Sequence, residues 1–160
     1  MGKVVFQAES SAGNVDVVDR QILNLLQKDC RLSFNKVAGK IGVSVGTAYN
    51  RIKRLEAKGV LKGYSVMVDS AKMGYGLTAL ILVQAEGGHL IEVEEVVAKV
   101  GSVIAVYDVT GDYDACIIAK FHDRNSLNMF LKQLSAASYV KRTLTNVALT
   151  TVKEDFRVNL

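Results

Sequence analysis

Residues 33–58 carry two helical patterns separated by a glycine, and this stretch constrains the fold more than any other part of the chain. Ser33 can cap the first helix, and Gly42 is a residue at which that helix would end. Ser44 can cap the second helix, which Gly59 would close. We therefore predict two short helices that share an apolar core and are joined by a tight turn. Their core-facing residues are Phe34, Val37, Ala38 and Ile41 in the first helix, and Ala48, Ile52 and Leu55 in the second.

The second of these helices has a polar face opposite its apolar one. At 100° per residue, that face holds a glycine, a tyrosine, an asparagine and two cations. An asparagine amide can pair bidentately with adenine, and lysine or arginine can contact guanine edges or phosphates. We therefore predict that this helix enters a DNA groove. The candidate DNA-binding residues are Ser44, Gly46, Thr47, Tyr49, Asn50, Arg51, Lys53, Arg54 and Lys58.

A polar helix face is also what any small domain presents to water, so the distribution of charge decides between the two interpretations. Residues 28–62 contain nine Lys or Arg and two Asp or Glu, a net charge of plus seven. Residues 70–160 contain nine basic and ten acidic residues, a net charge of minus one. A basic excess confined to the two-helix region is typical of a surface that binds phosphates. It also predicts DNA binding that weakens steeply with salt.

The length and composition of the chain indicate a globular protein. Its 160 residues are 49% hydrophobic, enough for one ordinary domain or two small ones with buried cores. No apolar run reaches the roughly 18 residues that span a bilayer, and residues 1–14 lack a secretory signal pattern. We therefore expect a cytoplasmic protein without a membrane partner. Cys30 and Cys116 have no CxxC spacing, so we expect reduced thiols and no metal site.

The region around the two helices contains two further predicted elements. A first helix is predicted over residues 17–28, with Asp16 as its cap. Residues 60–69 predict two short strands turned at Lys62 and Gly63, and this hairpin would have to pack on the helices to be stable. Three helices and a hairpin make a winged helix-turn-helix. The predicted division of the chain is a flexible lead over residues 1–14, the winged helix-turn-helix over 15–63, a linker over 64–76 and a second domain over 77–160.

The second domain shows strand and helix patterns in the order β-α-β-β-α-β. Strands are predicted over residues 77–86, 102–110, 115–123 and 140–153, and helices over 90–100 and 124–135. This order is typical of a ferredoxin-like α+β fold, with an antiparallel sheet and both helices on one face. The other face would be rich in Val, Ile and Leu. An apolar patch of that size is rarely left in water, so we expect it to pack on a second copy of the chain.

Four stretches carry longer motifs, namely VDVVDRQILNLLQ at 15–27, RLSFNKVAGKIGVSVGT at 31–47, RIKRLEAKGVLKGY at 51–64 and VTGDYD at 109–114. Together they resemble the Lrp/AsnC family, the feast/famine transcription regulators, over about residues 15–155. Gly101 stands where the family often has proline, and Gly46 replaces a bulkier residue at the start of the recognition helix. Because of this second difference, the resemblance does not indicate which operator sequence is read.

The resemblance implies a DNA-binding dimer whose C-terminal domain, of the RAM type, pairs through its sheet. It further implies assembly into tetramers or octamers, and the sensing of a small amino acid between dimers. Such a dimer would place two recognition helices in successive major grooves of a pseudo-palindromic operator in double-stranded DNA. The resemblance implies no catalytic residue and no cofactor other than the amino-acid effector.

The GDYD turn is the candidate effector site. Gly111 permits a tight turn, and the carboxylates of Asp112 and Asp114 can accept hydrogen bonds from an ammonium group. Backbone N–H groups of such a turn can hold a carboxylate, and we expect Asp114 to be the main ammonium acceptor. An ordinary hairpin turn is the competing interpretation, since Asp and Gly are common in turns. The candidate effector residues are Gly111, Asp112, Tyr113, Asp114, Thr143 and Thr145.

Two other functions remain open from the sequence. Some proteins that resemble this family are siroheme-type decarboxylases, which have the same two domains but do not read DNA. The two histidines of the chain, His89 and His122, lie in predicted loops or helix ends, where a solvated surface histidine is the usual interpretation. No GxSxG, HExxH or P-loop motif is present, so we do not expect an enzyme. An architectural protein that coats DNA without an effector would need the basic region but not the GDYD turn.

Overall fold

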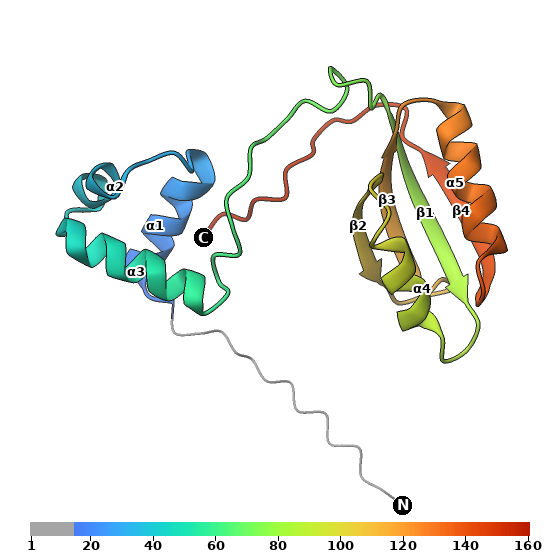
Figure 1. Ribbon diagram of the computed structural model, residues 1–160, viewed down its shortest axis with the longest axis horizontal. Coiled ribbons are helices and arrows are strands. Elements are labelled where there is room, and N and C mark those ends of the chain that lie inside the picture. Colours follow the sequence, from blue (N-terminus) through green and yellow to red (C-terminus); the bar gives the residue numbers. More distant parts are fainter. Residues whose placement is uncertain (1–14) are drawn as a thin grey trace, which may run out of the picture. The chain divides into compact units, whose positions relative to one another are not determined.

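The computed structural model describes residues 15–160, which form two compact units (Figure 1). The helical unit consists of residues 15–67 and 155–160, and the sheet unit consists of residues 68–154. The lead predicted over residues 1–14 lies outside the described residues. Across residues 15–160, no helix has the length and apolar content needed to cross a membrane.

Three helices form the helical unit: α1 is Val17–Lys28, α2 is Phe34–Ile41 and α3 is Val45–Ala57. Each follows a polar cap, as predicted. The Asp16 carboxylate accepts a hydrogen bond from the Asp19 N–H at 2.9 Å, and the Asp19 carboxylate accepts one from the Asp16 N–H at 3.2 Å. Ser33 and Ser44 cap the other two helices, and Gly42 ends α2 with a φ of 75°, which suits glycine. Local residues therefore set where these helices begin and end.

The core of the helical unit lies where the three helices meet. Its buried apolar residues are Ile22, Leu23, Leu26, Val37, Ala38, Ala48, Ile52 and Leu55. Fully burying a Leu or Ile side chain stabilises a fold by roughly 1.5–3 kcal/mol. The two alanines let the helices approach closely where α2 and α3 meet the core. The predicted apolar faces of the helices are thus the faces that pack, although Phe34 at the start of α2 stays 38% exposed.

The hairpin predicted over residues 60–69 is wrong, because these residues form no strand. Leu61 packs against the helical core, but Val66, Met67 and Val68 are 76%, 69% and 61% exposed. A two-stranded hairpin is marginal by itself, and side chains that do not reach the core cannot stabilise it. The segment that follows α3 is therefore an extended connection.

The end of the chain returns to the helical unit. The Asn24 amide donates a hydrogen bond to the Leu160 carbonyl at 2.6 Å and accepts one from the Leu160 N–H at 3.3 Å. The Gln27 amide donates to the Val158 carbonyl at 3.1 Å. Residues 155–160 thus belong with α1, and the prediction of one continuous second domain over 77–160 differs from the structure at its last residues. Hydrogen bonds from side chains 131 to 136 residues away have no local sequence signal.

The sheet unit has the predicted β-α-β-β-α-β order. Its elements are β1 Leu77–Ala85, α4 Leu90–Val97, β2 Val103–Asp108, β3 Ala115–Phe121, α5 Arg124–Ala136 and β4 Val140–Val147. The strands lie in the order β2-β3-β1-β4, and every pair is antiparallel. This order confirms the predicted ferredoxin-like α+β fold. Strand β4 ends at Val147 rather than at residue 153, because Val147 pairs with Ala79 near the start of β1 and little partner strand remains.

The two faces of the sheet differ because side chains alternate along each strand. One face packs on both helices, with Ile81 and Ile117 fully or nearly fully buried beneath residues of α4 and α5. The opposite face, here called the open face, is apolar but carries no helix. Its side chains from neighbouring strands include Leu80, Leu82, Tyr107, Cys116, Ile118 and Leu144. Leu80, Tyr107 and Leu144 are 39%, 46% and 42% exposed, so the open face presents an apolar surface of the predicted kind.

Candidate nucleic-acid interface and effector loop

The first turn of α3 is tightly capped and open to solvent. The Ser44 hydroxyl accepts a hydrogen bond from the Thr47 N–H at 3.0 Å and lies 2.8 Å from the Thr47 hydroxyl. A Cβ built on Gly46 would meet only the Ser44 hydroxyl, at 4.0 Å, so nothing crowds the backbone there. Asn50 is exposed one turn further along the helix. The structure thus presents Ser44, Gly46, Thr47 and Asn50 together at the exposed start of α3.

Tyr49 contributes to packing as well as to the exposed surface. Its ring meets the Phe34 ring edge to face, with centroids 5.2 Å apart and an interplanar angle of 86°. This contact joins the start of α2 to the middle of α3, and aromatic pairs of this geometry are favourable. Tyr49 remains 44% exposed. It therefore helps to set the angle between the two helices while part of its ring stays accessible.

Lys53 is exposed but pairs with a carboxylate of its own helix. Its ammonium group lies 2.7 Å from Glu56, and the Tyr64 hydroxyl donates to the other oxygen of Glu56 at 2.9 Å. The hydrogen bond raises the pKa of Lys53 and lowers that of Glu56. Burial, together with Glu56, raises the pKa of Tyr64 to about 12. These contacts fasten the start of the connection at residue 64 to the last turns of α3.

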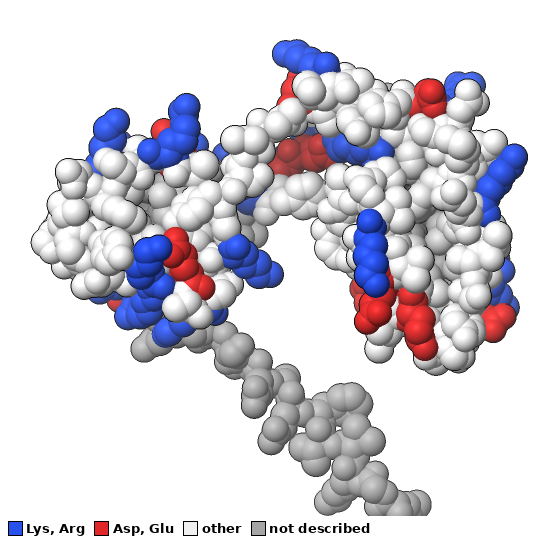
Figure 2. All heavy atoms as spheres, viewed as in Figure 1, with Lys and Arg blue, Asp and Glu red and all other residues white. Residues whose placement is uncertain are grey.

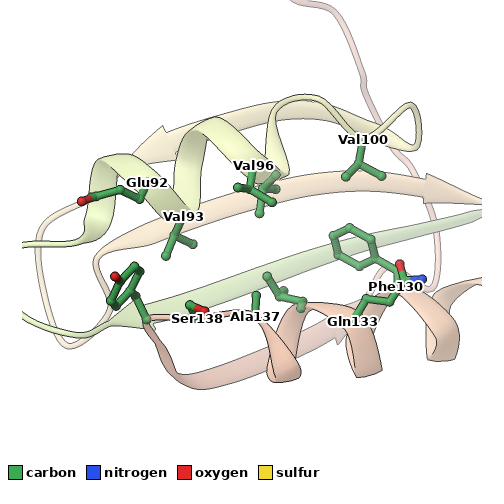
Figure 3. A pocket seen from close by; sticks show the side chains of 11 residues that line it. Glu92, Val93, Val96, Val100, Phe130, Gln133, Ala137 and Ser138 are labelled. Carbon is green, nitrogen blue, oxygen red and sulfur yellow. The ribbon is translucent and has the colours of Figure 1, made fainter.

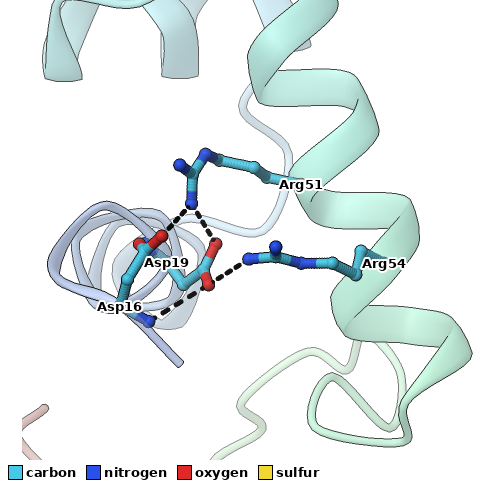
Figure 4. Close-up of polar contacts among 4 residues, drawn as sticks. All are labelled: Asp16, Asp19, Arg51 and Arg54. Atoms are coloured by element: carbon cyan, nitrogen blue, oxygen red, sulfur yellow. Dashed lines mark hydrogen bonds and ion pairs between the residues drawn. The ribbon is translucent and has the colours of Figure 1, made fainter. Parts of the chain in front are cut away.

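Arg51 and Arg54 point from α3 to the start of α1 (Figure 4). A guanidinium nitrogen of Arg51 lies 2.9 Å from the Asp19 carboxylate and also pairs with Asp16, and Arg54 pairs with the other oxygen of Asp19. The hydrogen bond to Arg51 lowers the pKa of Asp16, and the bonds to Asp16 and Asp19 raise the pKa of Arg51. The Asp19 side chain is fully buried, and a buried carboxylate requires such partners.

Lys53 and Arg54 are the two cations that helical spacing predicts on the outward face of α3, and this network corrects the prediction for Arg54. Helical periodicity places Arg51 and Arg54 at the border of the polar face, where their side chains bend back to Asp19. Their partners precede them by 32 and 35 residues, so spacing along α3 could not have found them. Both guanidinium groups are therefore engaged within the protein, and they orient the helix on which the exposed polar residues lie.

Cations outside α3 add to the same unit. Figure 2 shows several Lys and Arg side chains on the visible face of the helical unit, with few Asp or Glu among them. Lys36 and Lys40 on α2, and Lys58 and Lys62 after α3, are exposed. Lys36 and Lys40 were not among the candidate residues, although the net charge of plus seven over residues 28–62 includes them. That charge count was the signal that could have identified them.

The loop between β2 and β3 contains the GDYD turn. The Val109 N–H donates to the Asp114 carbonyl, and the Asp114 N–H donates to the Val83 carbonyl, both at 2.9 Å. The Asp114 carboxylate accepts a hydrogen bond from the Ala85 N–H at 2.8 Å. Ala85 lies where the pairing of β1 with β4 shifts register, so its N–H needs a partner outside the ladder. Asp114 therefore has a structural task that the sequence prediction did not assign to it.

The other residues of the turn are differently placed. Gly111 has a φ of 120°, in the region that favours glycine, and Asp112 is exposed. Tyr113 is half-buried, and the Arg142 guanidinium lies 5.7 Å from the centroid of its ring. Arg142, on β4, was not predicted as a site residue. A cation beside this turn could pair with the carboxylate of a ligand. Arg142 could not be identified from the sequence, because its place beside the turn depends on how the strands pair.

Thr143 and Thr145 lie on the helix-covered face of β4, not on the open face. Thr143 is opposite Val83 and Thr145 is opposite Ile81, and both threonines are half-buried. Arg142 alternates with them and points to the other face. The structure brings Arg142 into contact with Tyr113 of the turn, while the two threonines face the helix-covered side of the sheet. Within residues 15–160, no three His, Cys, Asp or Glu side chains gather as a group that could hold a metal ion.

Two family models match the chain along most of its length. The AsnC-type helix-turn-helix domain matches residues 15–56, and the Lrp/AsnC ligand binding domain matches residues 78–158. An uncharacterised HTH-type transcriptional regulator of Pyrococcus furiosus is 48% identical over 144 residues, which cover 90% of this chain and 97% of that protein. The chain belongs to the Lrp/AsnC family. The resemblance found in the sequence motifs is thereby confirmed.

Solved structures of Lrp/AsnC proteins have the same fold. An AsnC family transcriptional regulator from Agrobacterium tumefaciens superposes with a TM-score of 0.82 at 25% identity, over 89% of this chain and 95% of that one. The feast or famine regulatory protein of Mycobacterium tuberculosis superposes with a TM-score of 0.84 at 23% identity, over 91% and 99% of the two chains. By the two family models and the Pyrococcus furiosus relative, the chain is a DNA-binding transcriptional regulator of the Lrp/AsnC family.

Proposed function

We propose that the exposed start of α3 reads the operator of this Lrp/AsnC regulator, and that a small amino acid changes its affinity for that operator. The observation that carries the first part is the exposed Asn50, one turn beyond an uncrowded helix start. In helix-turn-helix proteins the first turns of the second helix contact base edges. Thr47 and Asn50 would contact bases, and Lys58 would contact a phosphate. Arg51 and Arg54 would orient the helix through Asp19.

The two exposed lysines of α2 support this assignment. In a helix-turn-helix the first of the two helices, which corresponds to α2 here, crosses the DNA backbone. The second, which corresponds to α3, lies in the groove. Lys36 and Lys40 are exposed on α2 and would therefore contact phosphates. Contacts of this kind supply affinity without sequence preference and make it depend on salt.

The open face supports assembly into a dimer. Its side chains are apolar and partly exposed, and Lys120 at one end pairs with Glu154 within the same unit. Joining two open faces about a twofold axis would remove this apolar surface from water. A dimer would present two copies of α3 to successive major grooves of a pseudo-palindromic site. Further association into tetramers or octamers would allow an effector to act by changing which assembly is populated.

The amino-acid part of the proposal is supported by a relative and by the loop geometry. The structure of the feast or famine regulatory protein of Mycobacterium tuberculosis is that of its complex with L-methionine. In this chain, the exposed Asp112 carboxylate would accept from the ammonium group, since Asp114 already accepts from Ala85. Arg142, beside Tyr113, would pair with the effector carboxylate.

A two-stage experiment tests the proposal. The full chain is screened by thermal unfolding against the twenty amino acids, and an operator is selected from random DNA. Each amino acid that stabilises the protein is then added to anisotropy titrations with the selected operator. A coupling of about 1–3 kcal/mol would change the operator affinity about 5- to 150-fold.

Other outcomes would favour the other functions. Equal affinity for selected and random DNA, with no amino acid acting, would indicate a DNA-coating protein. Absence of DNA binding at low salt would contradict the proposal and reopen the decarboxylase-like alternative. Because the proposed residues of the two parts lie in separate units, DNA binding and amino-acid binding can fail independently in this experiment.

A further inference from the structure

A cavity of about 350 Å³ lies between α4 and α5 in the sheet unit (Figure 3). Its walls are largely apolar: Val93, Val96 and Val100 lie on one side, and Phe130 and Leu134 on the other. Binding pockets for small molecules commonly begin at about 300 Å³ and have apolar walls with a few polar groups. The cavity therefore has the size and lining of a small-molecule site. It is separate from the GDYD loop, whose residues do not line it.

Part of the apolar surface that lines the cavity is not buried in the core of the sheet unit. Val93 and Val97 are 5% and 3% exposed and belong to the core, whereas Val96 on the same helix is 60% exposed and Val100 is 36% exposed. A second hollow, of about 320 Å³, continues from the cavity and shares Val100, Phe130 and Gln133 with it. Helix α4 thus leaves part of its apolar surface uncovered beside α5. A bound apolar group would bury that surface.

Tyr139 lines the cavity and is held there in an uncommon conformation. Its φ of 69° is the only positive φ of a non-glycine residue within residues 15–160, and a bulky residue rarely adopts such a value. The Tyr139 carbonyl accepts a hydrogen bond from the Glu86 N–H at 2.8 Å. Its ring stacks on that of His89, with centroids 3.8 Å apart and an interplanar angle of 7°. These contacts fix the wall before any ligand arrives.

Glu92 gives the cavity its charge. It is the one charged side chain among the described residues that line the cavity, and it lies at the same end as Ser138 (Figure 3). The Glu92 carboxylate lies 3.2 Å from Nδ1 of His89, the residue that stacks on Tyr139. A carboxylate beside an apolar pocket attracts a cation, and the hydroxyl groups of Ser138 and Tyr139 can accept further hydrogen bonds from an ammonium group.

We propose that this cavity binds a small primary amine with an apolar or aromatic body, its ammonium group on Glu92 and its body between Val96 and Phe130. The site is complete within one copy of the chain. It does not depend on the amino-acid site proposed at the GDYD loop.

A matched pair of ligands tests the charge preference. Isothermal titration calorimetry of the full chain is carried out with 4-phenylbutylamine and with 4-phenylbutanoate, which have similar bodies and opposite charges. We expect saturable binding of the amine and at least tenfold weaker binding of the acid. Glu92→Gln should weaken the amine at least tenfold. Failure of the amine to bind at millimolar concentration, or equal binding of amine and acid, would overturn the proposal.

A matched pair of variants tests the location. Ala137 lines the cavity, whereas its neighbour Ala136 is exposed and does not. Ala137→Leu should fill the space and abolish amine binding, and Ala136→Leu should leave it unchanged. If a variant does not fold, amide chemical-shift changes in the unaltered chain decide. Changes in residues 92–100 and 130–139 would support the site, and changes confined to residues 109–114 would overturn it.

Discussion

The helical unit and the sheet unit are stabilised in different ways. The helical unit has eight buried apolar residues in its core, and the sheet unit has thirteen. The smaller core is supplemented by Asp19, the one buried charged side chain among residues 15–160, which two arginines of α3 hold. The larger core has no buried charged side chain among the described residues, and its sheet leaves the apolar open face. The helical unit thus combines a small core with internal charge pairs, whereas the sheet unit combines a larger core with an apolar face that no helix covers.

Asp19→Ala should have the largest effect, because it removes the acceptor that holds Arg51 and Arg54 against α1. Removing one member of a buried ion pair typically costs about 3–5 kcal/mol, and we expect the lower value because the side chains of Arg51 and Arg54 are 26% and 43% exposed. Urea unfolding followed by circular dichroism measures the loss. Asp29→Ala, which removes the partner of the exposed Arg31, is the control and should change stability little. Equal effects of the two substitutions would show that the network does not stabilise the helical unit.

Leu144→Glu tests whether the open face of the sheet unit forms the proposed dimer interface. Leu144 lies near the middle of the open face, opposite Leu82. An unpaired carboxylate there should weaken dimerisation about 100-fold, measured by sedimentation equilibrium. Leu149→Glu is the control, since Leu149 is 99% exposed and lies beyond β4. An unchanged dissociation constant for Leu144→Glu would move the dimer interface to another surface.

Asn50→Ala distinguishes reading of bases from orientation of the helix. Loss of a base contact should cost about 2 kcal/mol on the selected operator and much less on random DNA. Stability should not change, in contrast to Asp19→Ala. Anisotropy titrations measure both affinities, and Asn125→Ala, at an exposed position of α5, is the control. Equal losses on both kinds of DNA would remove Asn50 from base recognition.

Asp114→Ala tests whether this residue supports the sheet or the effector. The Ala85 N–H would lose its acceptor, which should destabilise the sheet unit by about 1 kcal/mol. Asp112→Ala is the matched control, because Asp112 is exposed on the same turn. It should leave stability unchanged and remove the response to an amino acid. The opposite pattern would return the ammonium-binding role to Asp114.

The contribution of Asp16 to the acid response should be the smallest of these effects, and it lies in the helical unit. The pKa of Asp16 is lowered by its hydrogen bond to Arg51, so folding gains stability above the ordinary Asp pKa. That contribution is lost as the pH falls below about 4 and through the lowered pKa of the folded state. Unfolding midpoints measured against pH, with Asp16→Asn as the comparison, test this. An identical acid response in the variant would exclude Asp16 as its source.

Local signals were enough to predict the helices and strands, whereas contacts between distant residues were not predicted. Asp16, Ser33 and Ser44 cap the predicted helices because capping involves residues three positions apart. The order of strands followed from periodicity and a known supersecondary pattern. The hairpin over 60–69 was wrong because its apolar side chains do not reach a core that would stabilise the two strands.

The same reasoning explains what was missed in the candidate sites. The exposed positions on α3 follow from helical spacing. The partners of Arg51 and Arg54 do not, since they lie on another helix. The contact of Arg142 with Tyr113 depends on which strands are neighbours. The side chains of Arg51 and Arg54 reach partners far away in the sequence, and the spacing of residues along one helix does not indicate such partners.

The return of residues 155–160 to α1 affects how the protein is made and handled. During synthesis α1, α2 and α3 emerge first, but the hydrogen bonds of Asn24 with Leu160 can form only after the sheet unit has been translated. The helical unit is therefore completed only after the whole sheet unit has been translated. For the same reason, an affinity tag fused after residue 160 would lie beside α1 in the DNA-binding unit, and a tag at that end could disturb operator binding without touching the sheet.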